Sequence, residues 1–155
     1  MNKKIVAAAV LLRVSLGWFM FFAGLGKIID PAWSAKSFLL GAKTFSDFYA
    51  WFALPANLWW VDPLNEWGLF FVGLALLLGV SIRFASFAGA AFMVLYYFPH
   101  LTFPYVSHSF LVEEHVIYAL AFMLVAFLPH AHMLGLSAAL KRTPLGKIPL
   151  VRSLL

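Results

Sequence analysis

Apolar residues along this chain form four long runs, separated by polar or proline-containing segments. The runs are Ile5 to Gly26, Leu64 to Ile82, Phe84 to about Phe98, and Val112 to about Leu128. A helix that crosses the core of a bilayer needs roughly 20 apolar residues. The first two runs are of about that length and the other two are slightly shorter. The pattern predicts an all-α integral membrane protein, a four-helix bundle that forms one domain over residues 1–155.

The segment between the first two runs, residues 30–62, is rich in aromatic residues. Asp30 and Asp62 each precede a proline, as an N-cap precedes proline at the first helical position. Thr44 and Asp47 have the spacing of a variant capping box. We expect one or two interfacial helices on the outer surface, and the second span to start at Asp62. Aromatic anchoring at the interface explains this composition better than a lid over the bundle, but both alternatives stay open.

Composition and charge narrow the class of protein. The 155 residues are 64% hydrophobic and 11% charged, which excludes an ordinary soluble enzyme or a disordered tail. The chain has no cysteine, so it offers neither a catalytic thiolate nor a cysteine-ligated iron–sulfur cluster. The first run is too long for a typical signal-peptide core and no A-x-A cleavage site follows it, so we interpret it as a span.

The distribution of charges predicts the orientation. With the N-terminus inside the cell, most basic residues lie on the cytoplasmic side, which includes a tail over residues 134–155: Lys3, Lys4, Arg83, Lys141, Arg142, Lys147 and Arg152. All six acidic residues then lie at or near the outer face. We expect a multi-pass protein of the plasma membrane with both termini cytoplasmic. The basic tail is then a signal for topology and anionic lipids, and we expect no nucleic-acid partner.

Small residues predict where helices pack closely. Ala75 and Gly79 form a small-xxx-small pair in the second run, and Ala85 and Gly89 form another in the third. The turn between these runs is short, so we expect the second and third spans to pack as an antiparallel hairpin.

One stripe of the first span combines charge with small residues. Arg13, Gly17, Phe21, Gly24 and Lys27 are spaced by three or four residues and share one helix face. A cation at the depth of Arg13 is costly and should face the bundle interior, a partner or a polar ligand. It could equally reach cytoplasmic headgroups or cap backbone carbonyls. The two glycines would let another backbone, or a flat ligand, approach.

A second group of candidate residues opens the fourth run. Glu113, Glu114 and His115 are followed by Tyr118, and Glu114 and Tyr118 share a helix face. Other polar residues are expected at the same outer level: Lys27, Asp30, Glu66, His100 and His108. Reducing a quinone takes two electrons and two protons, and carboxylates or histidines beside an apolar slot can deliver protons. A hydrated helix end, stabilised by its negative charges, is the alternative.

The histidines do not predict a metal or haem site. His130 and His132 should lie at the opposite membrane face from His100, His108 and His115, and a b-type haem needs two histidines at one depth on facing helices. No pair on one helix has the spacing of a metal site. We therefore expect histidines without a ligand, no metal and no bound haem. The sequence shows neither a phosphate-binding loop nor a nucleophile–base signature.

Three segments, in this order along nearly the whole chain, resemble the DoxX/DoxD family of membrane proteins. The first is Leu12-Arg13-Val-Ser-Leu-Gly17-Trp-Phe-Met-Phe21-Phe-Ala-Gly24-Leu-Gly-Lys27 with Asp30-Pro-Ala-Trp33-Ser. The second is Trp67-Gly-Leu with Gly73-Leu-Ala-Leu-Leu-Leu-Gly79 and Arg83, and the third is Val112-Glu-Glu-His115-Val-Ile-Tyr118-Ala-Leu. The resemblance is closest to the DoxD branch, although Glu113 and Glu114 stand where aspartate is common.

The resemblance to DoxD implies a subunit of a thiosulfate:quinone oxidoreductase, which makes tetrathionate and works with a second small membrane subunit, DoxA. We expect Lys27, Glu114 and His115 to take part in the reaction. We expect Arg13, Gly17, Gly24 and Tyr118 to bind quinone, the electron acceptor.

Two other kinds of function remain open. The chain could be a non-enzymatic accessory or scaffold subunit of a respiratory or other membrane redox complex. Association into a homo-oligomer is also open. A solute carrier fits less well, because four spans without an inverted repeat leave little room for alternating access.

Overall fold

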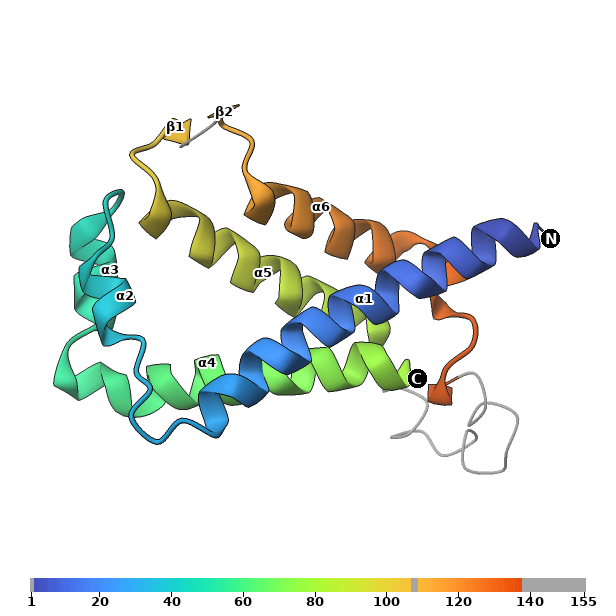
Figure 1. The fold of residues 1–155 in the computed structure, drawn as a ribbon, viewed down its shortest axis with the longest axis horizontal. Coiled ribbons are helices and arrows are strands. Elements are labelled where there is room, and N and C mark those ends of the chain that lie inside the picture. The colour runs from blue at the N-terminus through green and yellow to red at the C-terminus, as the bar shows by residue number, and fades with distance from the viewer. Residues whose placement is uncertain (1, 107–108, 138–155) are drawn as a thin grey trace.

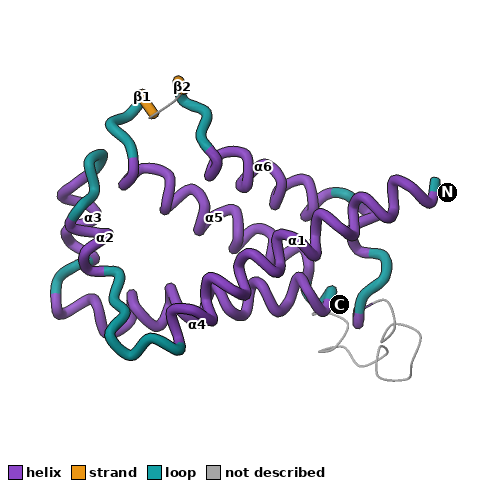
Figure 2. Tube along the Cα trace, in the orientation of Figure 1, coloured by secondary structure: helices purple, strands orange, loops and turns teal. Residues whose placement is uncertain are grey.

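The computed structural model describes residues 2–106 and 109–137, and these form an almost entirely helical protein (Figures 1 and 2). The helices are α1 (Lys3–Ile28), α2 (Lys36–Leu40), α3 (Ser46–Phe52), α4 (Pro55–Leu78), α5 (Ile82–His100), α6 (Glu114–Phe127) and the 3-10 helix η1 (Pro129–His132). Two short antiparallel strands, β1 (Tyr105–Val106) and β2 (Ser109–Phe110), join α5 to α6. The expected all-α class is confirmed. His108 and most of the expected tail lie outside the described residues.

Among the described residues, three helices are long and apolar enough to cross a membrane: α1, α4 and α5. The fourth expected span corresponds to α6, which has 14 residues and is about 21 Å long at 1.5 Å per residue. That is shorter than a bilayer core of roughly 30 Å. The bundle therefore has four apolar helices, of which the fourth is the short one.

The four bundle helices alternate in direction. The N-terminus of α1, the turn from α4 to α5 and the C-terminal end of α6 lie at one end of the molecule (Figure 1). The opposite end holds the C-terminus of α1, helices α2 and α3, and the strands (Figure 1). Polar residues near the N-terminus of α1 and polar residues near its C-terminus therefore lie at opposite ends of the molecule and have different neighbours.

The expected interfacial segment contains two short helices, but they start later than the sequence suggested. Asp30 does not cap a helix. Its Oδ1 accepts a hydrogen bond from the Ala32 amide at 3.0 Å, within a turn. Thr44 does not cap α3 either, because its hydroxyl oxygen is hydrogen-bonded to Leu101 O and the Phe103 amide at the end of α5. These side chains fasten the segment to other parts of the fold.

The prediction that Asp62 starts the second span is wrong. Helix α4 begins at Pro55, and Pro63 lies inside it. Asp62 Oδ1 accepts a hydrogen bond from the Ala35 amide at 2.9 Å, so it anchors the residue before α2. A proline inside an apolar helix is tolerated where neighbouring elements satisfy the backbone. In this fold the early turns of α4 pack against α2 and α3 in a second small core.

Helices α1 and α4 approach each other through glycines. A Cβ on Gly17 would lie 2.9 Å from Leu77 N, and one on Gly24 would lie 2.8 Å from Glu66 O. A Cβ on Gly73 of α4 would collide with the backbone of Phe21. Inside a bilayer, the burial of apolar side chains contributes little to the association of helices. Close contact between backbones is then a principal source of the association free energy.

The small residues of α5 pack differently from the prediction. Gly89 faces α6, where a Cβ would lie 2.7 Å from the ring of Phe122, and Phe122 is fully buried. Gly79 ends α4 in a left-handed conformation with φ of +69°. The most extensive contacts join α1 to α4 and α5 to α6, and those between α4 and α5 are fewer. Helices α4 and α5 do form an antiparallel hairpin, but α4 packs more closely against α1, and α5 packs more closely against α6.

Arg13 closes the end of the bundle that holds the N-terminus. Its side chain is only 2% exposed. Its Nη1 donates to Ala131 O at 2.9 Å and Met133 O at 3.2 Å, and its Nη2 donates to Leu134 O at 2.8 Å. Carbonyls beyond a helix end need such donors, and hydrogen bonds offset the cost of the buried charge. The geometry supports the carbonyl-capping alternative for Arg13.

Gly24→Ala should destabilise the protein, whereas Gly26→Ala should not. Nothing lies within 4 Å of a Cβ on Gly26, and alanine favours a helix over glycine by up to about 1 kcal/mol. Overpacking at Gly24 should cost about 1–3 kcal/mol. Thermal unfolding of both variants in the same detergent tests this, and equal midpoints would contradict the close contact.

Arg13→Lys keeps the charge but cannot offer the planar fork of donors that meets three carbonyls. We expect a loss of about 1–3 kcal/mol of stability, measured as a lower unfolding midpoint. The control is Arg83→Lys. Arg83 is exposed and its Nε lies 3.5 Å from Ala126 O, so this variant should unfold as the wild type does. A similar loss in both variants would refute the role of Arg13.

Candidate functional site

A polar cavity of about 350 Å³ lies at the end of the bundle that holds α2 and α3. Its walls come from α1, the turn after it, α2, α4, α5 and α6. The lining residues are Lys27, Trp33, Ser34, Ala35, Ser37, Phe38, Asn65, Tyr96, His100 and His115. The volume is within the range of ligand pockets, roughly 300–1,000 Å³.

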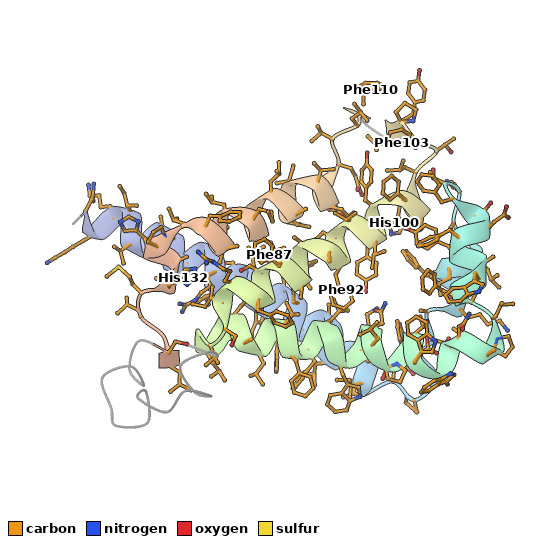
Figure 3. All side chains as sticks on the ribbon, turned by 180° about the vertical axis from the view of Figure 1, so that it is seen from behind. Phe87, Phe92, His100, Phe103, Phe110 and His132 are labelled. Atoms are coloured by element: carbon orange, nitrogen blue, oxygen red, sulfur yellow. The ribbon has the colours of Figure 1, made fainter. Side chains whose placement is uncertain are left out.

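Two histidines line this cavity, and a carboxylate outside its lining contacts one of them. His115 Nδ1 lies 2.8 Å from Oε2 and 3.0 Å from Oε1 of Glu113. The rings of His100 and His115 are stacked, with centroids 5.6 Å apart and an angle of 28° between planes. A carboxylate on Nδ1 favours the tautomer with a proton there, which leaves Nε2 for another partner. Figure 3 shows His100 at the end of α5 nearest α2 and α3, and His132 at the far end of the molecule.

Lys27 brings a positive charge to the lining of the cavity. Its Nζ lies 4.1 Å from the ring centroid of Trp33, a cation–π contact that holds the ammonium group in place. The carboxylate of Glu66, the residue after the cavity residue Asn65, attracts the ammonium group electrostatically. Within the described part of the chain, Lys27 Nζ makes no hydrogen bond, so its three donors can serve a ligand.

Two of the lining residues, Asn65 of α4 and Tyr96 of α5, are hydrogen-bonded to each other. The Tyr96 hydroxyl donates to Asn65 Oδ1 at 2.6 Å. No hydrogen bond engages the Asn65 amide nitrogen or the His100 ring among the described residues. The cavity thus combines aromatic surfaces with several uncommitted donors, an arrangement that suits a flat ligand with acceptor oxygens.

The structure brings together only some of the residues that the sequence singled out. Lys27 and His115 line the same cavity, although 87 positions separate them in the chain. Glu114 is exposed, and it is Glu113 that contacts His115. Tyr118 packs against the ring of Phe19, with centroids 5.1 Å apart, and is not part of the cavity wall.

The remaining predicted residues lie elsewhere. Gly17 and Gly24 face the backbone of α4, so the approaching group is a neighbouring helix rather than a flat ligand. Arg13 binds carbonyls at the opposite end of the bundle. The quinone-binding role expected of these three residues therefore has no support in their positions.

Several cavity residues were not chosen from the sequence. Asn65 is a polar residue inside a long apolar helix, which is a signal of function in a membrane protein. Trp33 and Tyr96 belong to a chain so rich in aromatic residues that neither stands out. Nothing in the spacing of His100 and His115 predicts that their rings stack.

The carboxylates next to His115 also have the composition of a cation site. Ligand atoms of Glu113, Glu114 and His115 all lie within 4.8 Å of one another. Exposed acidic groups often occur without a metal ion, and Glu114 is exposed. The expectation of no metal stays a prediction.

Comparison with known proteins identifies the family. The family model named DoxX matches residues 8–101, which include α1 from its sixth residue, all of α2 to α5, and the cavity residues Lys27, Asn65, Tyr96 and His100. No match was found among curated proteins or among solved structures. The match covers more than half of the chain, and the three long apolar helices agree with it. The chain is a multi-pass membrane protein that belongs to the DoxX family.

Proposed function

We propose that the polar cavity binds the headgroup of a membrane quinone, and that the chain is a DoxD-like membrane subunit of a thiosulfate:quinone oxidoreductase. One observation carries the proposal: uncommitted hydrogen-bond donors, together with a histidine that is paired with a carboxylate behind it, line a cavity walled by aromatic rings. The electron donor is taken from the resemblance to DoxD, and the cavity supports the acceptor.

The residues present fit a quinone ring. Quinone carbonyls are acceptors, and Lys27 Nζ, the Asn65 amide and an N–H of the His100 ring are donors on the walls of the same cavity. The aromatic side chains of Trp33, Phe38 and Tyr96 offer surfaces on which a flat ring can stack. A small number of polar groups in a largely aromatic setting is typical of ligand pockets.

The histidine–carboxylate pair gives the cavity a proton donor. When both of its ring nitrogens carry a proton, His115 can donate the Nε2 proton to a quinone oxygen. Glu113, which contacts Nδ1, stabilises this charged form of the ring. The ammonium group of Lys27 stabilises negative charge as electrons reach the ring. In this proposal Glu113 takes the role that the sequence suggested for Glu114, because Glu113 is the carboxylate in contact with His115.

The proposed reaction balances with thiosulfate as the reductant. Two thiosulfate dianions lose one electron each and join through a new S–S bond to form tetrathionate. The two electrons and two protons convert the quinone to the quinol. We assign the quinone pocket and proton delivery to this chain, and we propose a second small membrane subunit, DoxA-like, as its partner in thiosulfate oxidation.

The proposed location is the plasma membrane with both termini in the cytoplasm. Lys3, Lys4 and Arg83 lie at one end of the bundle, and Lys27, Lys36 and Lys43 lie toward the other end with Asp30, Asp62 and Glu113. The proposed orientation therefore depends on the four basic residues of the tail, which the sequence assigns to the same side as the N-terminus. The positive-inside rule then puts the cavity near the outer face, where thiosulfate from outside the cell can approach.

Membranes that contain this chain and a candidate small partner should reduce a quinone analogue when thiosulfate is added, and should form tetrathionate in a 1:1 ratio with quinol. Membranes without the chain are the control. If the inserted chain gives no thiosulfate-dependent reduction with its partner present, the oxidoreductase proposal fails. The chain would then be better described as an accessory subunit, whose partners co-purification would identify.

His115→Gln and Glu113→Gln should each lower kcat for quinone reduction, His115→Gln by about 100-fold, because general acid catalysis typically contributes at least that much. Glu114→Gln is the matched control, since the same change is made at the neighbouring exposed carboxylate. It should stay within about threefold of the wild type, as surface changes away from a site usually do. A larger loss in Glu114→Gln than in Glu113→Gln would contradict the assignment.

A further inference from the structure

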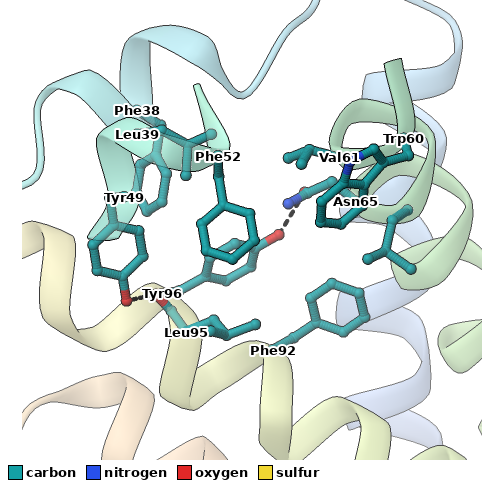
Figure 4. Close-up of a pocket in the computed structure, with 11 residues that line it drawn as sticks. Phe38, Leu39, Tyr49, Phe52, Trp60, Val61, Asn65, Phe92, Leu95 and Tyr96 are labelled. Carbon is teal, nitrogen blue, oxygen red and sulfur yellow. Dashed lines mark hydrogen bonds between the residues drawn. The ribbon is translucent and has the colours of Figure 1, made fainter. Parts of the chain in front are cut away.

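A second, apolar chamber adjoins the polar cavity. Its volume is about 90 Å³. Its lining comes from α2 to α5 and includes Phe38, Tyr49, Leu64, Asn65, Leu95 and Tyr96 (Figure 4). Phe38, Asn65 and Tyr96 also line the polar cavity. The two spaces therefore adjoin each other at these three side chains.

The apolar chamber reaches the lateral surface between α4 and α5. Leu64 on α4 is 56% exposed and Leu95 on α5 is 46% exposed, although both line the chamber. Both helices are long and apolar enough to span a membrane. A surface between two such helices faces hydrocarbon in a bilayer, so the chamber can be entered from the lipid phase.

Helix α3 closes the chamber on the side away from the bundle. The Tyr49 hydroxyl donates to Leu95 O at 2.9 Å (Figure 4), and this bond fastens α3 to α5. Tyr49 is only 3% exposed, and burial raises the pKa of its phenol, so the donor proton is retained at physiological pH. The Tyr49–Leu95 bond therefore holds α3 over the chamber, while Leu64 and Leu95 remain exposed between α4 and α5.

The Tyr96–Asn65 hydrogen bond lies where the two spaces meet (Figure 4). Tyr96 presents its ring to both spaces and its hydroxyl to α4. The Asn65 amide nitrogen remains uncommitted among the described residues and can donate to an oxygen at the boundary. This pair separates a region with several polar donors from one lined mostly by apolar side chains.

We propose that the apolar chamber is the subsite for the hydrophobic substituent of the ligand whose polar ring lies in the polar cavity, and that this ligand enters from the bilayer between α4 and α5. This inference rests on the proposed function and specifies its substrate class as quinones with an apolar tail. The chamber has room for the first branched carbons of such a tail, and the exposed edges of Leu64 and Leu95 let the rest extend into lipid.

Leu64→Trp and Leu95→Trp fill the chamber from its exposed rim, where a larger side chain need not disturb the core. Leu120→Trp is the matched control, because Leu120 on α6 is 65% exposed and lines neither space. Each variant is reconstituted in nanodiscs of one lipid composition, so that partition of the ligand into lipid is the same throughout. An unchanged unfolding midpoint confirms that each variant is folded.

Two probes separate the ring from the tail. One is a dimethoxy-methyl-benzoquinone with a decyl chain that carries a photoreactive diazirine near the ring. The other has a methyl group in place of the chain, and its binding is followed by calorimetry. The first should cross-link to α4 and α5 around Leu64 and Leu95, and Leu64→Trp or Leu95→Trp should raise its apparent Kd about tenfold, the affinity of one or two buried methylenes. Leu120→Trp should change nothing.

The outcomes distinguish the two proposals. If the tail-less ring binds to all variants and the rim substitutions leave binding and cross-linking of the tailed probe unchanged, the tail subsite is refuted and the quinone cavity stands. If neither probe binds to the wild type, the proposed function fails and the subsite fails with it. Neither result depends on thiosulfate or on a partner subunit.

Discussion

The architecture depends on the contact between α1 and α4. Helices in a bilayer gain little from removing apolar side chains from lipid, so their association relies on close packing. Gly17 and Gly24 on α1, with Gly73 on α4, provide that packing because their missing side chains let the backbones touch. The same contact determines how α1 is rotated. It points Lys27 toward the residues of α4 that help to line the cavity, and it uses the two glycines that could otherwise have admitted a ligand.

Two cations of α1 illustrate two uses of a positive charge in a membrane protein. Arg13, ten residues after the start of the helix, is buried and donates to three backbone carbonyls in the segment that follows α6. Lys27, in the last turn of the helix, lies over Trp33 and makes no hydrogen bond among the described residues. A committed cation stabilises the fold, whereas an uncommitted one beside a cavity is available to a ligand.

The cavity forms where α4 and α5 are less closely packed than α5 and α6. Contacts between α4 and α5 are limited compared with those between α1 and α4, and α2 and α3 pack beside the early turns of α4 rather than leaving that end open. Asp62 and Tyr49 each reach across to a backbone group of another element. The aromatic segment over residues 30–62 is therefore more than an anchor in the described structure. Phe38 and Trp33 form walls of the cavity, while Trp51 and Trp59 remain largely exposed.

The apolar runs along the chain were sufficient to predict an all-α membrane protein. A helix that crosses a bilayer needs a certain number of consecutive apolar residues and satisfies its backbone hydrogen bonds within itself, so both requirements can be read from a short stretch of sequence. The same runs were also sufficient to identify Lys27 and His115 as unusual, since charged and titratable groups stand out in apolar helices. The local pattern of Asp62 followed by proline predicted the start of a helix, and that prediction was wrong. The Asp62 side chain instead accepts a hydrogen bond from the Ala35 amide, in a distant part of the sequence. Which carboxylate contacts His115, and which face of α1 meets α4, depend on the rotation of each helix about its axis. That rotation is decided by packing between distant segments, so only the tertiary structure decided that Lys27, Asn65, His100 and His115 share one cavity.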